Sequence, residues 1–252
     1  MDHPPVAIVH YHLRRGGVTR VIESCSTILS KAGIPHVILS STAPKGRRKL
    51  PFRVVPELAY GTEGGGSGTS VVRAIRKATS EALGTSKPLW HFHNHTVGKS
   101  RGYAEAVGIL AESGDPLVIQ YHDFAEDGRP GNYPVIAGCD SLYPVAPQIL
   151  HAFVNSRDRN HLIHAGLPED QTILHPNPIT PPARLSPLRR TPSHPLVFSP
   201  GRGIRRKNLG EIFLLASLAP RGTRFAVSLA PENPRWSPVH EDWAAFGKDT
   251  QL

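Results

Sequence analysis

The sequence contains few cysteines and no long hydrophobic run. Its two cysteines, Cys25 and Cys139, are far apart in the 252 residues and lack the spacing of a metal site. A disulfide framework is therefore not expected, and a reducing compartment is favoured. No secretory signal is recognisable, because Pro4 and Pro5 precede an apolar stretch of only a few residues. Since no apolar run approaches the ~20 residues that span a bilayer, these absences predict a soluble, cytoplasmic protein.

Acidic residues are scarce relative to basic ones. Asp and Glu total 20 against 29 Lys and Arg, which gives a formal net charge of +9. Such an excess suits anionic partners, namely nucleotide phosphates, nucleic acid or an acidic membrane surface. A basic cluster at Lys45–Lys49 leaves open a peripheral contact with the inner membrane face. No nucleic acid partner is expected, because Trp90, Trp236 and Trp243 are not interleaved with the basic clusters as a stacking platform requires.

The N-terminal stretch predicts a βαβ unit. Val6–Val9 is a continuous apolar run, which is typical of a parallel strand buried on both faces. Apolar residues then recur at helical spacing over residues 18–32, and the run His36–Leu39 has the character of a second strand. Gly16 and Gly17 come at the start of the expected helix, where bare backbone and a helix N-terminus suit an anion. A plain tight turn is the other explanation of the glycine pair.

Further apolar runs predict more strands of one parallel sheet. Strands are expected within residues 89–95, 117–120, 152–154 and 172–174, with helices over residues 71–82, 103–110 and 157–165. The stretch Pro181–Pro195 has many prolines and no apolar period, which is typical of a linker. We therefore expect an α/β protein. A Rossmann-like parallel sheet flanked by helices would occupy residues 1–180, and an incomplete second Rossmann-like domain would occupy residues 196–252.

Three histidines alternate in the third expected strand, within residues 89–95. If the strand extends through all of them, His91, His93 and His95 share one face, and alternating histidines can hold zinc. His122 and Asp123, which follow the next strand, would supply further ligands, so a metal-dependent hydrolase stays open. The favoured interpretation is a ligand crevice at the carboxyl ends of neighbouring parallel strands. No metal is expected in that case.

The stretch Leu196–Leu218 combines a strand, a glycine-rich basic turn and a helix. The expected strand covers Leu196–Phe198, and the turn after it carries Gly201, Arg202 and Lys207. Backbone N–H groups and the positive end of the helix dipole would point in the same direction as these basic side chains. A phosphate or diphosphate is the expected anion. A solvated basic turn is an equal alternative on this stretch alone.

Taken in order, these landmarks resemble GT-B glycosyltransferases, in particular the group called glycosyltransferase family 4. The ordered set is a glycine pair after the first strand, a histidine at a sheet end, an Asn-Pro that closes the first domain, and an Arg and a Lys after the linker. In this sequence the set is Gly16–Gly17, His122, Asn177–Pro178, Arg202 and Lys207.

The resemblance assigns expected roles to particular residues. Arg202 and Lys207 would bind the donor diphosphate, with help from the backbone of Gly16 and Gly17. His122 would contact the reacting sugar or position the acceptor. The expected residues on the acceptor side are His93, His95, Lys99 and Asp123.

The resemblance implies a retaining, metal-independent glycosyltransferase without a cofactor. It would move a sugar from a UDP- or GDP-linked donor to a glycan or a lipid-linked acceptor. The stretch after Pro195 is short for a nucleotide-binding half, and the acidic motif of the family, two Glu eight positions apart, has no match. We therefore expect a truncated chain or a missing C-terminal half, with apolar surface left exposed. The alternative is a non-catalytic or degenerate module that binds a nucleotide or a glycan.

Overall fold

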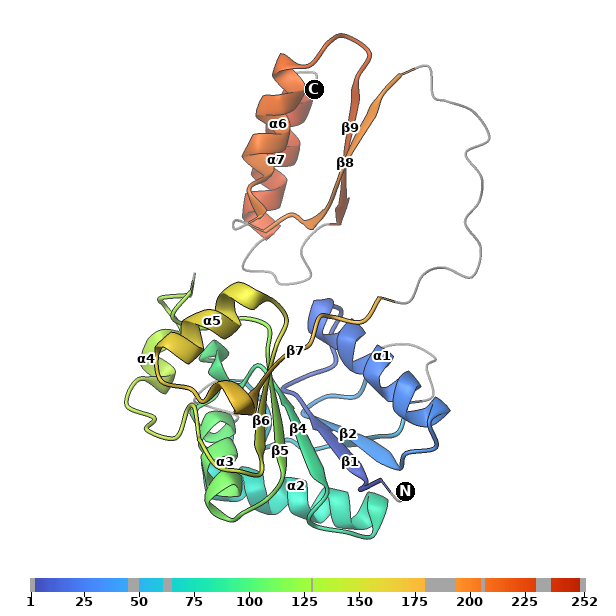
Figure 1. The fold of residues 1–252 in the computed structure, drawn as a ribbon. Helices are drawn as coiled ribbons and strands as arrows, with labels where there is room; N and C mark the ends of the chain where they lie inside the picture. Colours follow the sequence, from blue (N-terminus) through green and yellow to red (C-terminus); the bar gives the residue numbers. More distant parts are fainter. Residues whose placement is uncertain are drawn as a thin grey trace. The chain divides into compact units, whose positions relative to one another are not determined.

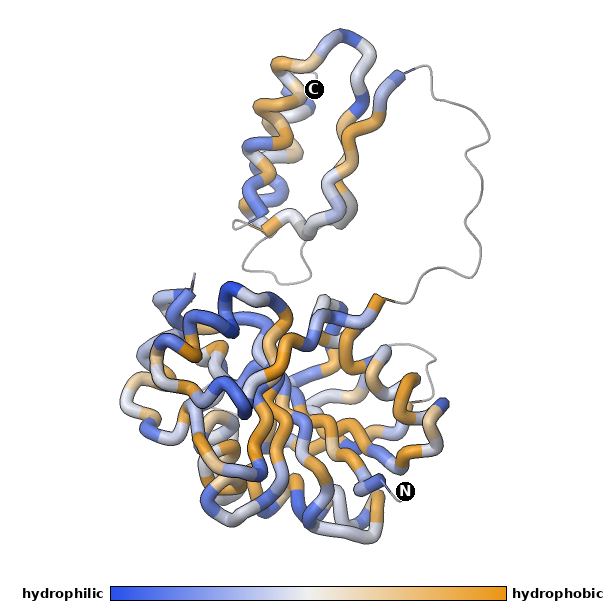
Figure 2. The backbone as a smooth tube through the Cα atoms, in the orientation of Figure 1, coloured by the Kyte–Doolittle hydropathy of each residue, from blue (hydrophilic) through white to orange (hydrophobic). Residues whose placement is uncertain are grey.

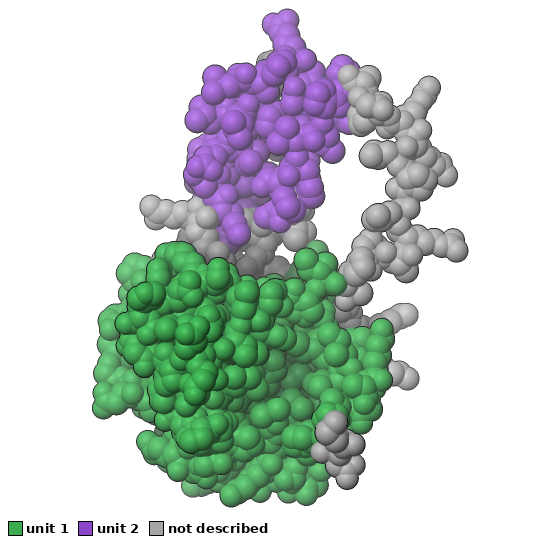
Figure 3. All heavy atoms as spheres, in the orientation of Figure 1, with its two compact units in different colours: residues 1–181 green, residues 182–252 purple. Residues whose placement is uncertain are grey.

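The computed structural model describes residues 3–44, 50–60, 65–127, 129–179, 194–204, 207–229 and 237–249. The chain divides into two compact units, residues 1–181 and 182–252, which are green and purple in Figure 3. The basic cluster Lys45–Lys49 and most of the stretch Pro181–Pro195 lie outside the described residues. Within the described ranges, no helix combines the length and the apolar character needed to cross a membrane.

The first unit alternates strands and helices along the chain, as Figure 1 shows. Its strands are β1 (Val6–Val9), β2 (His36–Ser40), β3 (Phe52–Val54), β4 (Leu89–His93), β5 (Leu117–Tyr121), β6 (Ile149–Phe153) and β7 (Thr172–Leu174). Its helices are α1 (Gly17–Lys31), α2 (Gly68–Leu83), α3 (Arg101–Glu112), α4 (Tyr133–Ile136) and α5 (Ser156–His164), with short 3-10 helices at His95–Val97 and Glu169–Gln171.

The strands of the first unit form one parallel sheet in the order β3-β2-β1-β4-β5-β6-β7. The chain starts in the middle at β1, builds outward to β3, and then returns to the other side of β1 with β4. Strand order therefore reverses between β1 and β4. In open α/β sheets, ligands bind outside the carboxyl ends of the strands at such a point. The expected Rossmann-like α/β fold is confirmed.

Helices cover both faces of this sheet, and the strands between them are mostly orange in the hydropathy view of Figure 2. On one face Ile22 of α1 packs with Ile8 of β1 and Ile38 of β2. On the other face α2 and α3 bury a larger cluster that includes Trp90 and Phe92 of β4. Burial on both faces explains why β1, β2 and β5 read as nearly continuous apolar runs.

A buried carboxylate ties α2 to the sheet. Asp115 has a fully buried side chain and lies just before β5. One of its oxygens accepts a hydrogen bond from Trp90 Nε1 at 3.0 Å, and the other pairs with the Arg76 guanidinium at 2.6 Å. A buried charge is tolerated when it is paired and hydrogen-bonded in this way. The contact fixes the end of the sheet opposite to the carboxyl ends of the strands.

Local structure differs from the expectation at several places. β4 ends at His93 rather than running through His95, because Asn94 adopts the left-handed conformation with φ 60° and a 3-10 turn follows. The edge strand β3 is additional to the expected strands. The N-cap of α5 is Asn155, whose side chain accepts a hydrogen bond from Asp158 N, so the helix begins at Ser156, one residue before the expected start at residue 157.

The second unit contains a two-stranded parallel sheet and two helices. They are β8 (Leu196–Arg202), α6 (Leu209–Leu218), β9 (Arg224–Leu229) and α7 (Ser237–Asp249). The helices pack through aromatic rings, since Phe213 of α6 stacks on Trp243 of α7 with ring centroids 5.6 Å apart. β8 extends through Arg202, which pairs with Leu229, so Gly201 and Arg202 belong to the strand and not to the expected turn.

Candidate functional site

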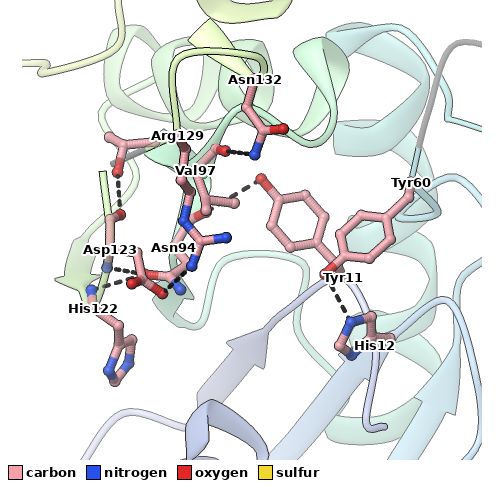
Figure 4. Close-up of polar contacts among 10 residues, drawn as sticks. Tyr11, His12, Tyr60, Asn94, Val97, His122, Asp123, Arg129 and Asn132 are labelled. Carbon is pink, nitrogen blue, oxygen red and sulfur yellow. Dashed lines mark hydrogen bonds and ion pairs between the residues drawn. The ribbon is translucent and has the colours of Figure 1, made fainter. Parts of the chain in front are cut away.

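Polar side chains gather in the first unit where β1, β4 and β5 end. His10 follows β1, Asn94 follows β4 and His122 follows β5. The carboxyl ends of these parallel strands meet at one edge of the sheet, at the reversal of strand order. Figure 4 shows part of this edge, and we call it the sheet-edge site.

Asn94 organises the sheet-edge site. Its side-chain Oδ1 accepts hydrogen bonds from the backbone N–H groups of His122, at 2.8 Å, and Asp123, at 3.0 Å. Its own carbonyl accepts from the hydroxyl of Tyr11 at 3.2 Å. Asn tolerates the left-handed conformation better than most residues, so the backbone of Asn94 can turn directly after β4. Its side chain meanwhile binds the backbone of the segment that follows β5. The sequence analysis did not single out this residue.

His122 and His93 form a hydrogen-bonded pair (Figure 4 shows His122). The two rings stack with centroids 5.3 Å apart, and His122 Nε2 lies 3.0 Å from His93 Nδ1. When both rings are neutral, one nitrogen of this contact donates the proton and the other accepts it. His93 is fully buried and its Nε2 has no hydrogen-bond partner among the described residues. His93 therefore lies against His122 and holds its ring in place through this contact.

Burial keeps the histidines of this edge neutral. Desolvation lowers the pKa of His122 to about 4, although Asp123 opposes the shift, and it lowers the pKa of His10 to about 3. Desolvation also lowers the pKa of His91 to about 4, and the pKa of His93 falls well below its usual value because burial and the neighbouring histidines act together. At neutral pH these rings thus act as paired donors and acceptors and not as cations.

His95 does not join this group. Because β4 ends before it, His91, His93 and His95 do not share one face of a strand. His95 is fully buried, its Nε2 lies 2.6 Å from the carbonyl oxygen of Leu142, and its ring lies against Tyr121. These contacts place the side chain of His95 in the core. Across the described ranges, no three His, Cys, Asp or Glu side chains are arranged to hold a metal ion.

Tyrosines form the opposite side of the sheet-edge site, as Figure 4 shows. Tyr11 follows β1, and its ring centroid lies 5.0 Å from that of Tyr60 and 4.2 Å from that of Tyr103. Tyr60 Oη lies 2.7 Å from His12 Nε2. Burial raises the pKa of Tyr60, so its hydroxyl stays protonated and can donate or accept a hydrogen bond.

Cationic side chains lie near Tyr60. The ammonium of Lys99 lies 5.7 Å from the ring centroid of Tyr60, a cation–π distance. The guanidinium of Arg129 forms an ion pair with Asp123 at 2.9 Å (Figure 4). Arg14 and Arg129 both act electrostatically on Tyr60, since each opposes the rise in its pKa. The structure thus brings the expected residues Lys99 and Asp123 together with Arg14 and Arg129, which the sequence analysis did not identify.

The glycine pair starts α1 next to this edge. Gly16 is the N-cap and Gly17 the first helical residue. A Cβ added at Gly17 would meet no atom within 4 Å, and one added at Gly16 would meet only the Arg14 carbonyl oxygen, at 3.9 Å. The backbone at this helix N-terminus is therefore open to a ligand from the side that a side chain would occupy.

The basic loop of the second unit is partly described. Lys207 precedes α6, and its backbone N–H donates to the carbonyl oxygen of Ile204 at 2.9 Å. A Cβ added at Gly201 would touch the stem of Lys207, and one added at Gly203 would meet the ring of His240. The side chain of Arg202 lies outside the described atoms. The loop thus comes close to α7, through His240, at the N-terminal end of α6.

A cavity of about 580 Å³ lies beyond the segment that follows His122, next to α5. Its lining residues include Phe124, Glu126, Asp127, Tyr143, Arg157, Asp158 and His161. Several of its polar groups are already paired, since the Tyr143 hydroxyl donates to Glu126 at 3.0 Å and Arg157 lies 3.6 Å from Asp127. The expected residues His93, Lys99, His122 and Asp123 do not line it, so we place the candidate site at the sheet edge.

Several solved structures share this fold. HepE from Anabaena, solved in complex with UDP and glucose, superposes with a TM-score of 0.64 at 14% identity, over 99% of this chain and 67% of that one. A glycosyltransferase from Rickettsia africae gives a TM-score of 0.62 at 13% identity, over 100% of this chain and 66% of that one. At these identities the likeness establishes the Rossmann-like fold.

A curated relative is similar in sequence. Mannosylglucosyl-3-phosphoglycerate synthase of Petrotoga mobilis is 26% identical, in an alignment that covers 97% of this chain and 57% of the relative. The chain thus spans little more than half the length of that protein. No family model matches the chain.

Proposed function

We propose that this chain belongs to a glycosyltransferase that moves a sugar from a nucleotide-diphosphate donor to an acceptor held at the sheet-edge site. The observation that carries the proposal is the likeness, over 97% of the chain, to a protein whose name describes the synthesis of a two-sugar phosphoglycerate. Solved proteins of the same fold include one bound to UDP-glucose. The order of landmarks along the sequence, from Gly16–Gly17 to Lys207, supports the same class.

On the donor side, we assign the diphosphate to Lys207 and Arg202 and to the open backbone at Gly16 and Gly17. When the bond between the anomeric carbon and the diphosphate oxygen breaks, negative charge develops on that oxygen. Positive side chains and helix N-terminal N–H groups stabilise this charge, which is usually the largest contribution to catalysis. The acceptor hydroxyl oxygen forms the new bond to the anomeric carbon, and its proton passes to the departing diphosphate, which has gained the electron pair of the broken bond.

On the acceptor side, we assign His122 to hydrogen-bond the sugar or to position the acceptor. A pKa of about 4 leaves the ring neutral at pH 7, so His122 serves as a hydrogen-bond partner and not as a proton donor of the imidazolium type. We further propose that the transfer retains the anomeric configuration and needs no metal, as the resemblance to glycosyltransferase family 4 implies.

The test is nucleotide binding by the 252-residue chain, measured by isothermal titration calorimetry with UDP, GDP and UDP-glucose. Lys207→Ala and Arg202→Ala should each weaken binding by about tenfold or more, because a hydrogen bond to a charged group contributes roughly 1.5–3 kcal/mol. Lys248→Ala, in the last turn of α7, removes the same charge from the same unit and is the matched control. Unchanged binding in both loop variants would refute the donor assignment.

Gly17→Ala gives a steric test of the first unit. The added methyl group meets no atom within 4 Å in the protein, and alanine favours a helix, so folding should be unaffected. If phosphates or the sugar approach this backbone, the methyl group should weaken binding of UDP-glucose by about tenfold. Nucleotide binding without any sugar transfer would favour the other candidate, a non-catalytic nucleotide-binding module.

A further inference from the structure

We propose that the cavity beside α5 binds an uncharged sugar unit of the acceptor, beyond the hydroxyl group that reacts at the sheet-edge site. We call this cavity the sugar subsite. The proposal rests on the glycosyltransferase function proposed above, and it adds the chemical class of one part of the acceptor. The sugar subsite lies within the first unit, and its volume of about 580 Å³ falls in the range of ~300–1,000 Å³ that is typical of small-molecule sites.

One segment of the chain connects the sugar subsite with the sheet-edge site. Phe124 lines the subsite and comes directly after His122 and Asp123. Since one residue spans at most ~3.6 Å, the Cα atoms of His122 and Phe124 lie within about 7 Å of each other. Thr96 holds this segment, because its hydroxyl donates to the carbonyl oxygen of Asp123 at 3.3 Å and its carbonyl oxygen accepts from Ala125 N at 3.0 Å. The two sites are therefore close enough for one ligand of two sugar units.

Part of the lining of the sugar subsite is apolar. Phe124 stacks on Tyr121 with ring centroids 5.3 Å apart, and Tyr143 stacks on the same ring at 6.1 Å. Leu162 is half-buried and Val145 is 53% exposed, and both line the subsite. A pyranose ring has a face of C–H groups, which leaves water favourably when it lies on such a surface. Because Tyr121 already holds both aromatic rings, little side-chain entropy is lost on binding.

Carboxylates form the polar part of the lining. They belong to Glu126 and Asp127, in the segment after β5, and to Asp158, in the first turn of α5. A carboxylate has two oxygens that together accept about four hydrogen bonds. Among the described residues, Glu126 accepts from the Tyr143 hydroxyl at 3.0 Å, and Asp158 Oδ2 accepts from Asn155 at 2.7 Å. The other lone pairs of these carboxylates suit the neighbouring hydroxyl groups of a sugar, each of which can donate.

The guanidinium of the sugar subsite is held only loosely. Arg157 lies 3.6 Å from Asp127, and the two side chains are 69% and 64% exposed. Such an exposed ion pair contributes little stability, so both groups can turn to the hydroxyls of a ligand. Three carboxylates outnumber the cationic lining residues even when His161 is protonated, so a ligand that carries a negative charge is repelled. Since the described side chains form no metal site, an uncharged ligand rich in hydroxyls fits this lining best.

The test measures sugar binding by saturation-transfer NMR on the 252-residue chain. The ligands are maltose, cellobiose and α-1,2-mannobiose, their monosaccharides glucose and mannose, and glucuronate. At least one disaccharide should bind about fivefold or more tightly than its monosaccharide, because its second unit gains further hydrogen bonds. Glucuronate should bind about fivefold more weakly than glucose at low ionic strength. No gain for any disaccharide, or glucuronate binding as tightly as glucose, would overturn the inference.

A tryptophan at Ala165 blocks the sugar subsite. Ala165 lines the cavity and is the exposed C-cap of α5, with φ −79° and ψ 0°. Ala32 is the exposed C-cap of α1, with φ −81° and ψ −1°, and each of the two alanines is followed by a glycine. Ala165→Trp should remove most of the gain for the disaccharide, whereas the matched control Ala32→Trp should keep it. An unchanged gain in Ala165→Trp would place the second sugar unit elsewhere and overturn the inference.

A second pair of variants tests the carboxylates. Glu126 is exposed, so Glu126→Ala should fold, and it should weaken disaccharide binding by about fivefold or more. Glu112→Ala, at the exposed end of α3, makes the same change in net charge and should leave binding intact. Equal effects of the two variants would show that Glu126 does not contact the sugar, which contradicts the assignment of the polar lining.

Nucleotide binding in the same samples separates the sugar subsite from the proposed function. Ala165→Trp should leave the binding of UDP and UDP-glucose unchanged, because the donor is assigned to Lys207 and to the glycine pair. Loss of UDP-glucose binding alone in this variant would place the donor sugar in the cavity and overturn the inference. A chain that binds UDP but no disaccharide overturns the inference while the donor assignment stands. Disaccharide binding that Ala165→Trp removes, in a chain that binds no nucleotide, would support the sugar site and overturn the proposed function.

Discussion

The two units contain similar elements, but the first unit buries its apolar side chains and the second leaves many of them exposed. Phe92 on β4 of the first unit is fully buried, whereas Phe198 on β8 of the second unit is 55% exposed. On helices the contrast is the same, because Leu110 of α3 is fully buried and Leu214 of α6 is 60% exposed. Both units show apolar strands and apolar helices in Figure 2, so hydropathy alone does not separate them.

The difference lies in the number of layers around each strand. In the first unit β4 has a strand on either side and helices on both faces, which is what a parallel sheet requires for burial. In the second unit β8 has one neighbouring strand, β9, and its helices α6 and α7 pack mainly on each other through Phe213 and Trp243. A βα pattern therefore yields a core only where further strands and helices enclose it.

The largest expected effect is acid unfolding of the first unit. Burial holds the pKa of His10 at about 3 and that of His91, His95, His122 and His151 at about 4, against 6.5 when unfolded. The folded pKa lies below the unfolded one, so the stability is complete above pH 6.5 and falls as the pH drops toward 4. Each group should cost about 2 kcal/mol between pH 7 and pH 5.

Protonation of several of these groups would therefore remove a large part of the ~5–15 kcal/mol that stabilises a typical domain. Urea unfolding at pH 8, 7, 6 and 5, followed by circular dichroism, should show a steep loss below pH 6.5. His95→Gln should reduce the slope by about 1.4 kcal/mol per pH unit, the effect of one proton. Stability that stays constant from pH 7 to pH 5 would show that these rings are hydrated.

The second largest expected effect is the loss of stability when a phenylalanine is removed, compared between β4 and β8. Phe92→Ala should destabilise the first unit by about 3–5 kcal/mol, because it leaves a cavity in a packed core. Phe198→Ala removes the same ring from β8, where it is largely exposed, and should change the stability of the second unit by about 0.5 kcal/mol or less. Thermal unfolding of both variants checks this. Equal losses would mean that Phe198 is buried in solution, and the contrast between the units would fail.

Much of the fold could be predicted from the sequence because its signals are local. The strands β1, β2, β5 and β7 are short apolar runs, and α1 and α2 carry apolar residues at helical spacing. Such patterns depend on which faces are buried and need no knowledge of distant neighbours. The edge strand β3 was not predicted, because it has only three residues, two of them exposed, and these form no clear apolar pattern.

The candidate site could be predicted only in part, because it depends on contacts distant in sequence. His122 and Lys99 were expected, but the position of Arg129 next to Tyr60 follows from tertiary packing that no local pattern encodes. Asn94 is a different case. An asparagine directly after a strand is a signal for the left-handed conformation, and that turn is what removes His95 from the histidine face. Asn94 thus marks the end of β4 at His93 in the sequence itself.

The smallest expected change in stability concerns the exposed face of α6. Leu214 and Leu218 are 60% and 75% exposed and lie one turn apart, so they form a continuous apolar strip. The double variant Leu214→Gln and Leu218→Gln should alter the free energy of unfolding by about 0.5 kcal/mol or less, since glutamine and leucine have similar helix propensities. Self-association of the chain should nevertheless fall, because exposed apolar patches promote it.

Sedimentation velocity over a range of concentrations measures that association. Ile28→Gln on α1 is the matched control, because Ile28 is also exposed and belongs to the first unit. Isolated exposed apolar residues are common on protein surfaces, so this control should change neither stability nor association. If the α6 variant and the control associate as strongly as the unchanged chain, the apolar surface of the second unit does not drive pairing. If only the Ile28→Gln control reduces association, the apolar surface that drives self-association lies on the first unit and not on the second.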